Sequence, residues 1–107
     1  MTDPYAHADF IFENAQKSAQ AKSTRVYLQE FRKSKKAILM AQSPAKTAAD
    51  REVYAYSHPD YLEVIDGIRV AVEQEELSHW QMVAAQARIE IWRSQEASNR
   101  QQDRVMR

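Results

Sequence analysis

The stretch from Ser57 to Gln102 decides the fold, and it reads SHPDYLEVIDGIRVAVEQEELSHWQMVAAQARIEIWRSQEASNRQQ. It contains no proline after Pro59 and a single glycine, while Ala, Gln, Glu, Arg, Leu and Ile dominate. These residues favour the α-helix, and nothing in the stretch forces an interruption. We therefore predict one long helix over residues 58–102 and a frayed tail at residues 103–107. Such a helix cannot bury its own apolar face, so another element must pack against it.

The N-terminal part of the chain supplies that element. Between Pro4 and Gln42 there is no glycine and no further proline, and apolar residues recur at loose helical spacing. This pattern predicts a first helix over residues 4–42. In residues 16–24 alanine is the only apolar residue, so this section allows close approach but buries little area. Whether the helix continues through it is left open.

The two long helices are joined by a short one. Pro44 disfavours helical geometry at Ser43, which ends the first helix and can cap a second one over residues 44–56. Because one glycine and three prolines in 107 residues allow few turns, the elements must be few and long. We predict a single all-α domain, residues 1–107: a long antiparallel helical hairpin with a short connecting helix, coiled-coil-like and oligomeric.

The start of the long helix has its own signal. Ser57 is followed by an acid three residues later, Asp60, which matches the capping-box pattern. The aromatic residues on either side of this boundary, Tyr56 and Tyr61, are expected to pack across it.

The amino-acid composition limits the kinds of partner and site that we expect. Lys and Arg number 15, Asp and Glu number 15, and there is no cysteine. The balanced charge gives no argument for a polyanionic partner, and a disulfide or thiolate metal site is impossible. No apolar run approaches the roughly 18 residues that would span a membrane, and no signal peptide is visible at the N-terminus. We expect a cytoplasmic setting, no membrane and no cofactor.

The long helix carries more apolar surface than one neighbour can cover. With Ile65 at the centre of a face, apolar residues fall on that face and on both flanks. A helix that is apolar on three sides usually touches more than one partner. We therefore predict a homo-oligomer, a dimer or higher, through this helix. The interface residues expected are Ile65, Ile68, Val72, Trp80, Val83, Ala87 and Ile91.

Charge is distributed unevenly along the chain. Residues 1–43 hold seven Lys and Arg against four acids, whereas residues 59–87 hold one Arg against six acids. An antiparallel arrangement matches these segments and helps to fix register more than stability. The expected neighbours are Lys22 and Arg25 with residues 73–76, and Lys33 and Lys36 with Glu63 and Asp66.

Glu76 and His79 form the one E-x-x-H pair of the chain. This spacing places a carboxylate and an imidazole on one helix face, as in di-iron helical bundles. A dimer would have to supply the second pair, with Glu13 or Glu30 from the first helix. The alternative, which we favour, is a polar break in an apolar seam. An enzyme that binds metal in a helical bundle is the third-ranked function.

Two groups of basic residues are candidates for contacts with nucleic acid. The first is a cluster in the first helix, interleaved with Tyr27 and Phe31; the second is sparse and terminal. For the first group we favour pairing with the acidic long helix, whereas no acidic segment remains to match the second. The candidates are Arg32, Lys33, Lys35 and Lys36, then Arg93, Arg100 and Arg104.

Aromatic residues gather near the predicted apex of the hairpin. Such residues at an exposed turn can anchor a protein partner. More often they pack the junction of a short helix on two long ones. The candidates for partner binding are Tyr54, Tyr56, His58 and Tyr61, together with Trp92 further along the chain.

The segments AAQARIEIWRSQ (residues 84–95) and YSHPDY (residues 56–61) resemble those of small helical proteins encoded by tailed bacteriophages and prophages. The likeness covers roughly the C-terminal half and assigns no catalytic residue. It implies an accessory protein in an infected bacterial cytoplasm, near replication or recombination genes. The leading hypothesis is a non-enzymatic protein-interaction or adaptor module. The alternative is a nucleic-acid-binding accessory protein in replication or recombination.

Overall fold

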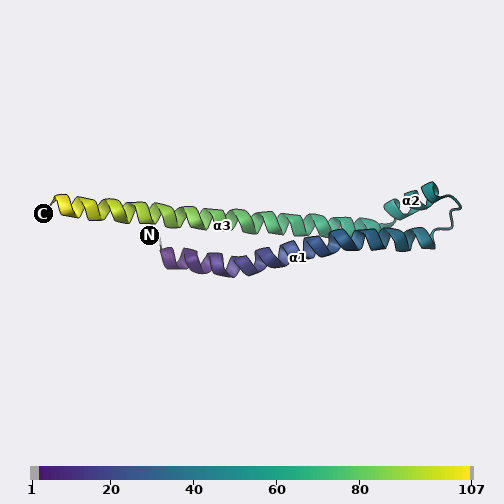
Figure 1. The fold of residues 1–107 in the computed structure, drawn as a ribbon, viewed down its shortest axis with the longest axis horizontal. Coiled ribbons are helices and arrows are strands. Elements are labelled where there is room, and N and C mark those ends of the chain that lie inside the picture. Colours follow the sequence, from purple (N-terminus) through teal and green to yellow (C-terminus); the bar gives the residue numbers. More distant parts are fainter. Residues whose placement is uncertain (1–2, 107) are drawn as a thin grey trace. The chain divides into compact units, whose positions relative to one another are not determined.

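The computed structural model describes residues 3–106, and these are all-α. Helix α1 spans Pro4–Gln42, α2 spans Ala48–Ser57 and α3 spans Pro59–Val105 (Figure 1). Helices α1 and α3 run antiparallel, and α2 lies in the connection between them. The predicted helical hairpin with a short connecting helix is confirmed. Helix α1 is continuous through residues 16–24, and α3 continues past residue 102, where the sequence suggested fraying.

Helix α2 begins later than the predicted start at Pro44. Ser43 does not cap it, because its hydroxyl accepts the N–H of Ala45 at 3.1 Å within the turn. Thr47 is the cap: its backbone is extended and its hydroxyl accepts the N–H of Asp50 at 3.1 Å. The proline ends α1 as expected, but the chain needs three more residues to reverse before a helix can start.

The cap of α3 also differs from the prediction. The hydroxyl of Ser57 donates to the carbonyl of Val53 at 2.6 Å and so belongs to the end of α2. His58 takes the capping position instead, and its Nδ1 accepts the N–H of Asp60 at 3.0 Å. The capping box predicted for Ser57 and Asp60 is therefore wrong, although the boundary is placed correctly.

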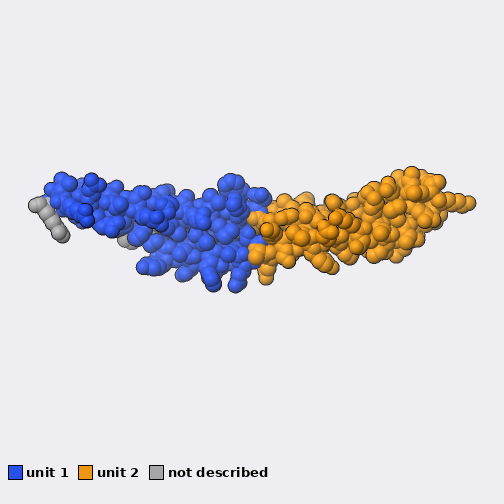
Figure 2. Space-filling model, viewed as in Figure 1, with its two compact units in different colours: residues 1–18, 76–107 blue, residues 19–75 orange. Residues whose placement is uncertain are grey.

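The helices group into two compact units (Figure 2). Unit 1 contains Met1–Ser18 and Glu76–Arg107, and unit 2 contains Ala19–Glu75. The described part of unit 1 is the start of α1 against the C-terminal part of α3. Unit 2 is the rest of α1, α2 and the start of α3. The sequence predicted one domain and did not indicate this division.

Within each unit α1 and α3 meet along a seam in which covered residues alternate at spacings of three and four. These positions are buried or half-buried, and the seam is coiled-coil-like. In unit 1 the seam residues are Ile11, Asn14 and Ser18 with Ser78, Met82, Ala85, Ile89 and Trp92. In unit 2 they are Ala21, Arg25, Leu28, Arg32, Lys35 and Leu39 with Tyr61, Val64, Ile68, Ala71 and Glu75.

The core is small. Leu39, Ala55 and Tyr61 form a buried cluster near α2, with Met40 packed against it. Leu39, at 1% exposure, is the one large side chain that is fully buried among the described residues. Elsewhere the buried seam positions carry small or polar side chains such as Ala71. Small side chains let helices approach closely, but they bury little apolar area.

Candidate protein-interaction surface

Helix α3 carries a second, uncovered stripe in unit 1, which we call the outer stripe: Leu77, Trp80, Ala84, Ala87 and Ile91. Its members recur at spacings of three and four, so they lie on one helix face, about 140° around α3 from the seam. Leu77 is 50% exposed, Trp80 61% and Ile91 58%. Both alanines are also exposed. Five apolar residues in a row on a solvent face are typical of a helix that has a further partner.

Local contacts hold the largest member of the stripe in place. The indole Nε1 of Trp80 donates to a carboxylate oxygen of Glu76 at 3.0 Å, one helical turn earlier. The ring of His79 lies edge-on to the indole, with centroids 5.2 Å apart. Because its polar atom is satisfied, Trp80 can offer its apolar area to a partner without leaving a buried donor unpaired.

The outer stripe contains part of the interface expected from sequence. Trp80, Ala87 and Ile91 lie on it. Leu77 and Ala84 were not among the expected interface residues, although their heptad spacing with Ile91 in the sequence was a usable signal. The remaining expected residues lie elsewhere: Ile68 is half-buried on the seam, Val83 is 37% exposed beside the stripe, and Ile65 and Val72 are 37% and 39% exposed in unit 2.

Glu76 and His79 have a different setting from a metal site. Within residues 3–106, no three His, Asp or Glu side chains gather in a metal-binding arrangement. The carboxylate of Glu76 accepts the Trp80 indole, and His79 packs on the same ring. Both are exposed outside the seam between α1 and α3, and a polar break at an interface with another chain stays a prediction.

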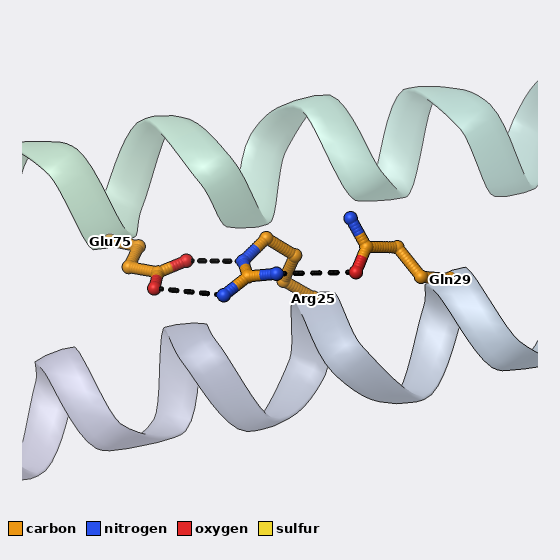
Figure 3. Close-up of polar contacts among 3 residues, drawn as sticks. All are labelled: Arg25, Gln29 and Glu75. Carbon is orange, nitrogen blue, oxygen red and sulfur yellow. Dashed lines mark hydrogen bonds and ion pairs between the residues drawn. The ribbon is translucent and has the colours of Figure 1, made fainter.

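Polar residues do interrupt the seam, at other positions. In unit 2 the guanidinium of Arg25 donates to both carboxylate oxygens of Glu75, at 2.6 and 3.2 Å, and to the amide oxygen of Gln29 (Figure 3). In unit 1 the buried amide of Asn14 donates to the carbonyl of Ser78 at 2.9 Å. Polar contacts in a seam, part-buried at Arg25 and buried at Asn14, favour one register, because a slip would leave them unpaired.

The ion pair changes the pKa values of its members. The hydrogen bond from Arg25 holds the pKa of Glu75 below its usual value, with smaller help from the charges of Arg25 and Lys22. The same hydrogen bond raises the pKa of Arg25. The expectation that Lys22 and Arg25 lie near residues 73–76 is confirmed.

The basic cluster of α1 is largely paired within unit 2. Lys33 contacts Glu30 at 3.2 Å on its own helix, Lys35 contacts Asp60 at 3.6 Å, and Lys36 contacts Glu52 of α2 at 3.3 Å. The pKa of Lys36 is raised, first by Tyr56 and then by Glu52. The partners Glu63 and Asp66 predicted for Lys33 and Lys36 are wrong. Lys33 pairs with Glu30 on its own helix, and Lys36 pairs with Glu52 because α2 folds back beside α1. Arg32 is half-buried on the seam.

The terminal arginines lie on a section of α3 that α1 does not cover. The first residues of α1, Ala6 and His7, line a shallow groove with Ala85 and Arg88 of α3. Helix α3 continues beyond the start of α1 (Figure 1), and residues 93–106 are all exposed. The arginines placed there are Arg93, whose guanidinium contacts Glu90 at 3.3 Å, then Arg100, whose Nε donates to the carbonyl of Glu96, and Arg104.

The apical aromatic residues mainly pack on one another. The rings of Tyr56 and Tyr61 meet edge-on at 5.3 Å, as expected, and those of Tyr54 and His58 meet at 5.5 Å. Tyr61 is buried, and the ammonium of Lys36 lies 4.7 Å from the Tyr56 ring. Packing of the junction therefore accounts for these contacts.

Trp92, the remaining candidate for partner binding, is half-buried at the end of the unit 1 seam. No helix among the described residues is long and apolar enough to cross a membrane. Comparison of the chain with protein-family models, with characterised proteins and with solved structures finds no match. The phage resemblance therefore stays a prediction, and function must be argued from the geometry.

Proposed function

We propose that the chain is a non-enzymatic protein-interaction module. The seam holds α3 against α1, and the outer stripe offers a helical face to another protein. The single observation that supports this most is the exposure of Leu77, Trp80 and Ile91, each at least half uncovered, on the side of α3 away from α1. Partner proteins bind such a helix face by contacting apolar residues that recur at helical spacing.

The hydrophobic free energy that the outer stripe can contribute to a complex is limited. Fully burying a leucine or isoleucine side chain contributes about 1.5–3 kcal/mol, and these two are about half exposed. With Trp80, the stripe offers roughly 3–5 kcal/mol of hydrophobic free energy before the cost of association. Association itself costs about 4–15 kcal/mol, so a complex also needs apolar area from the partner and contacts at the rim.

The test uses two double variants. Leu77→Gln with Ile91→Gln removes two large members of the stripe, and Val26→Gln with Val53→Gln removes two exposed valines in unit 2 as a matched control. We expect the wild type and the control to form a complex, with themselves or with a protein captured from the source cells. We expect the stripe variant to lose it.

Two measurements check this: sedimentation of the purified chain at several concentrations, and quantitative affinity capture. Circular dichroism of each variant must show retained helix before binding is compared. A chain that stays monomeric and captures nothing contradicts the proposal. So does a complex that both double variants retain equally.

A second candidate function is binding of nucleic acid through the end of α3. The observation that favours it is the common face of Arg93, Arg100 and Arg104, which lie within an arc of about 40° around the uncovered section of the helix. Arg100 and Arg104 have no ion pair among the described residues. Lys33, Lys35 and Lys36 of α1, by contrast, already contact carboxylates.

Titration of labelled single- and double-stranded DNA at two salt concentrations tests this candidate. Changing the three arginines to glutamine should weaken binding and reduce its salt dependence. The matched variant, with Lys33, Lys35 and Lys36 changed to glutamine, should bind as the wild type does. No binding at low salt, or equal loss in both variants, removes the candidate.

A further inference from the structure

We propose that the occupant of the outer stripe is a second copy of this chain, packed antiparallel along α3. The two-fold axis would pass between Ala84 and Ala87. This inference rests on the proposed function and deepens it by naming the partner and its orientation. It is argued from the order of large and small residues along the stripe, from the charges beside it and from the area it offers.

The order of side-chain sizes is self-complementary in the antiparallel direction. Placing Ala84 opposite Ala87 of the partner copy puts Trp80 opposite the partner's Ile91. By symmetry this Trp80–Ile91 pair occurs at both ends of the contact. Leu77 then meets Ser94 of the partner copy, at the next heptad position. Small residues in the middle allow the helix axes to approach, while a large residue from each copy fills each end.

A parallel arrangement fits less well. In register, it places each Trp80 opposite the other Trp80, between a layer of two leucines (Leu77) and two layers that contain only alanine. The tryptophan pair needs a wide separation and the alanine pairs a narrow one, so one of them must pack badly. In the antiparallel arrangement both ends of the contact hold the same side-chain volume, because each end has one Trp80 and one Ile91.

The charges beside the stripe permit this contact. On one side Arg88 faces Gln81 of the partner copy, and on the other Glu90 faces Val83. No like charges lie opposite each other in these pairs. The chain as a whole carries a formal net charge of zero at pH 7, so two copies do not repel through their overall charge.

The size of the contact limits the affinity expected for the dimer. From Leu77 to Ile91 the stripe extends over about 21 Å of helix, at 1.5 Å per residue. A contact of this length lies at the small end of specific interfaces, which bury about 1,200 Å² or more when stable. We therefore expect a dimer with a dissociation constant in the micromolar range, so it should dissociate on dilution.

The absence of cysteine from the sequence makes cross-linking a clean test. Leu77→Cys is mixed with an affinity-tagged copy that carries Ser94→Cys, and the mixture is oxidised mildly. We expect the mixed disulfide to dominate and each single variant alone to give little product. In the antiparallel dimer position 77 lies about 25 Å from position 77 of the partner copy, and the same holds for position 94. This distance is far too long for a disulfide. Gln86→Cys, exposed on another side of α3, replaces Ser94→Cys as the control and should not cross-link.

Sedimentation gives the second readout. Ile91→Gln should weaken dimerisation at least about tenfold, because it removes one large residue from both ends of a two-fold contact. Efficient cross-linking of Ser94→Cys with itself would overturn the antiparallel geometry. Equal cross-linking at Gln86→Cys would overturn the stripe as the contact.

The two proposals can fail separately. A monomer without mixed disulfide, which still captures another protein through Leu77 and Ile91, would overturn the second copy as occupant but retain the interaction module. A monomer that captures nothing would remove both.

Discussion

At the scale of single residues, the contacts that join α1 to α3 are polar as well as apolar. Arg25 and Glu75 form a two-point ion pair, and Asn14 donates to the backbone at Ser78. The sequence predicted the first contact approximately, from the distribution of charge. It did not predict the second, because a lone asparagine in a polar section has no distinctive pattern.

We predict that Glu75→Gln lowers the melting temperature at pH 7 and that the difference from wild type disappears in acid. The folded-state pKa of Glu75 is lowered by Arg25. The pair therefore stabilises fully above the unfolded carboxyl pKa of about 4.3 and is lost as pH falls through the lower folded-state value. Thermal melts from pH 7 to pH 2 measure this.

Glu63→Gln is the matched control, since Glu63 is an exposed acid of α3 in the same unit. Its melting difference from wild type should be small at every pH. A Glu75→Gln difference that persists undiminished at pH 2 would show that the ion pair is not its cause.

At the scale of the helix, the one glycine of the chain is a packing position. A Cβ added at Gly67 would lie 3.0 Å from Cδ1 of Leu28, on α1. Leu28 is therefore the neighbour that packs against this glycine. The contacting atom is the end of a flexible side chain that is only half-buried, so it can shift.

We predict that Gly67→Ala raises the free energy of unfolding by up to about 1 kcal/mol. Alanine is better than glycine inside a helix by about that amount, and the shift of Leu28 offsets part of it. Gly67→Val should destabilise, because a branched side chain cannot be accommodated by so small a shift. Urea denaturation of the three proteins gives the values. Destabilisation by alanine would mean that Leu28 is held too tightly to move.

The end of α3 should behave differently from its middle. Residues 93–106 are exposed, and α1 covers none of them. We predict that amides of residues 95–105 exchange with deuterium at least about tenfold faster than those of residues 81–92, because uncovered helix frays at low free-energy cost. Hydrogen exchange followed by mass spectrometry checks this. Equal protection in the two sections would indicate that a partner covers the end in solution.

At the scale of the whole molecule, folding and association should be linked. Fully buried large side chains are few among the described residues, and the outer stripe leaves apolar area uncovered. Whatever binds the folded chain and not the unfolded one raises its stability. If the bound partner is a second copy, stability must depend on the protein concentration.

We predict that the melting temperature rises by several degrees when the concentration increases from about 1 µM to about 100 µM, a range that spans the expected micromolar dissociation constant. Calorimetry at several concentrations measures it. Leu77→Gln with Ile91→Gln should melt at one temperature throughout, while Val26→Gln with Val53→Gln should follow the wild type. Wild-type melting that does not depend on concentration would contradict linked dimerisation.

The sequence by itself determined that the chain is a helical hairpin. Prolines mark where the long helices begin or end, and the lack of glycine elsewhere leaves the helix as the favoured state of the backbone. The opposite charges of the two long segments also indicated their antiparallel direction. Helix propensity is a property of the local sequence, and the charge of a segment is a sum over its residues. Both can therefore be obtained from the sequence without knowing the contacts between helices.

Only the tertiary structure decided which face of α3 packs against α1. Because α3 is apolar on several sides, hydrophobic periodicity permits more than one seam and does not say which side of α3 faces α1. The seam that forms has small residues where the helices approach and polar residues that find partners, as Glu75 does with Arg25. Pairing across helices depends on both chain segments at once, which is why only the tertiary structure shows that the seam leaves the outer stripe uncovered.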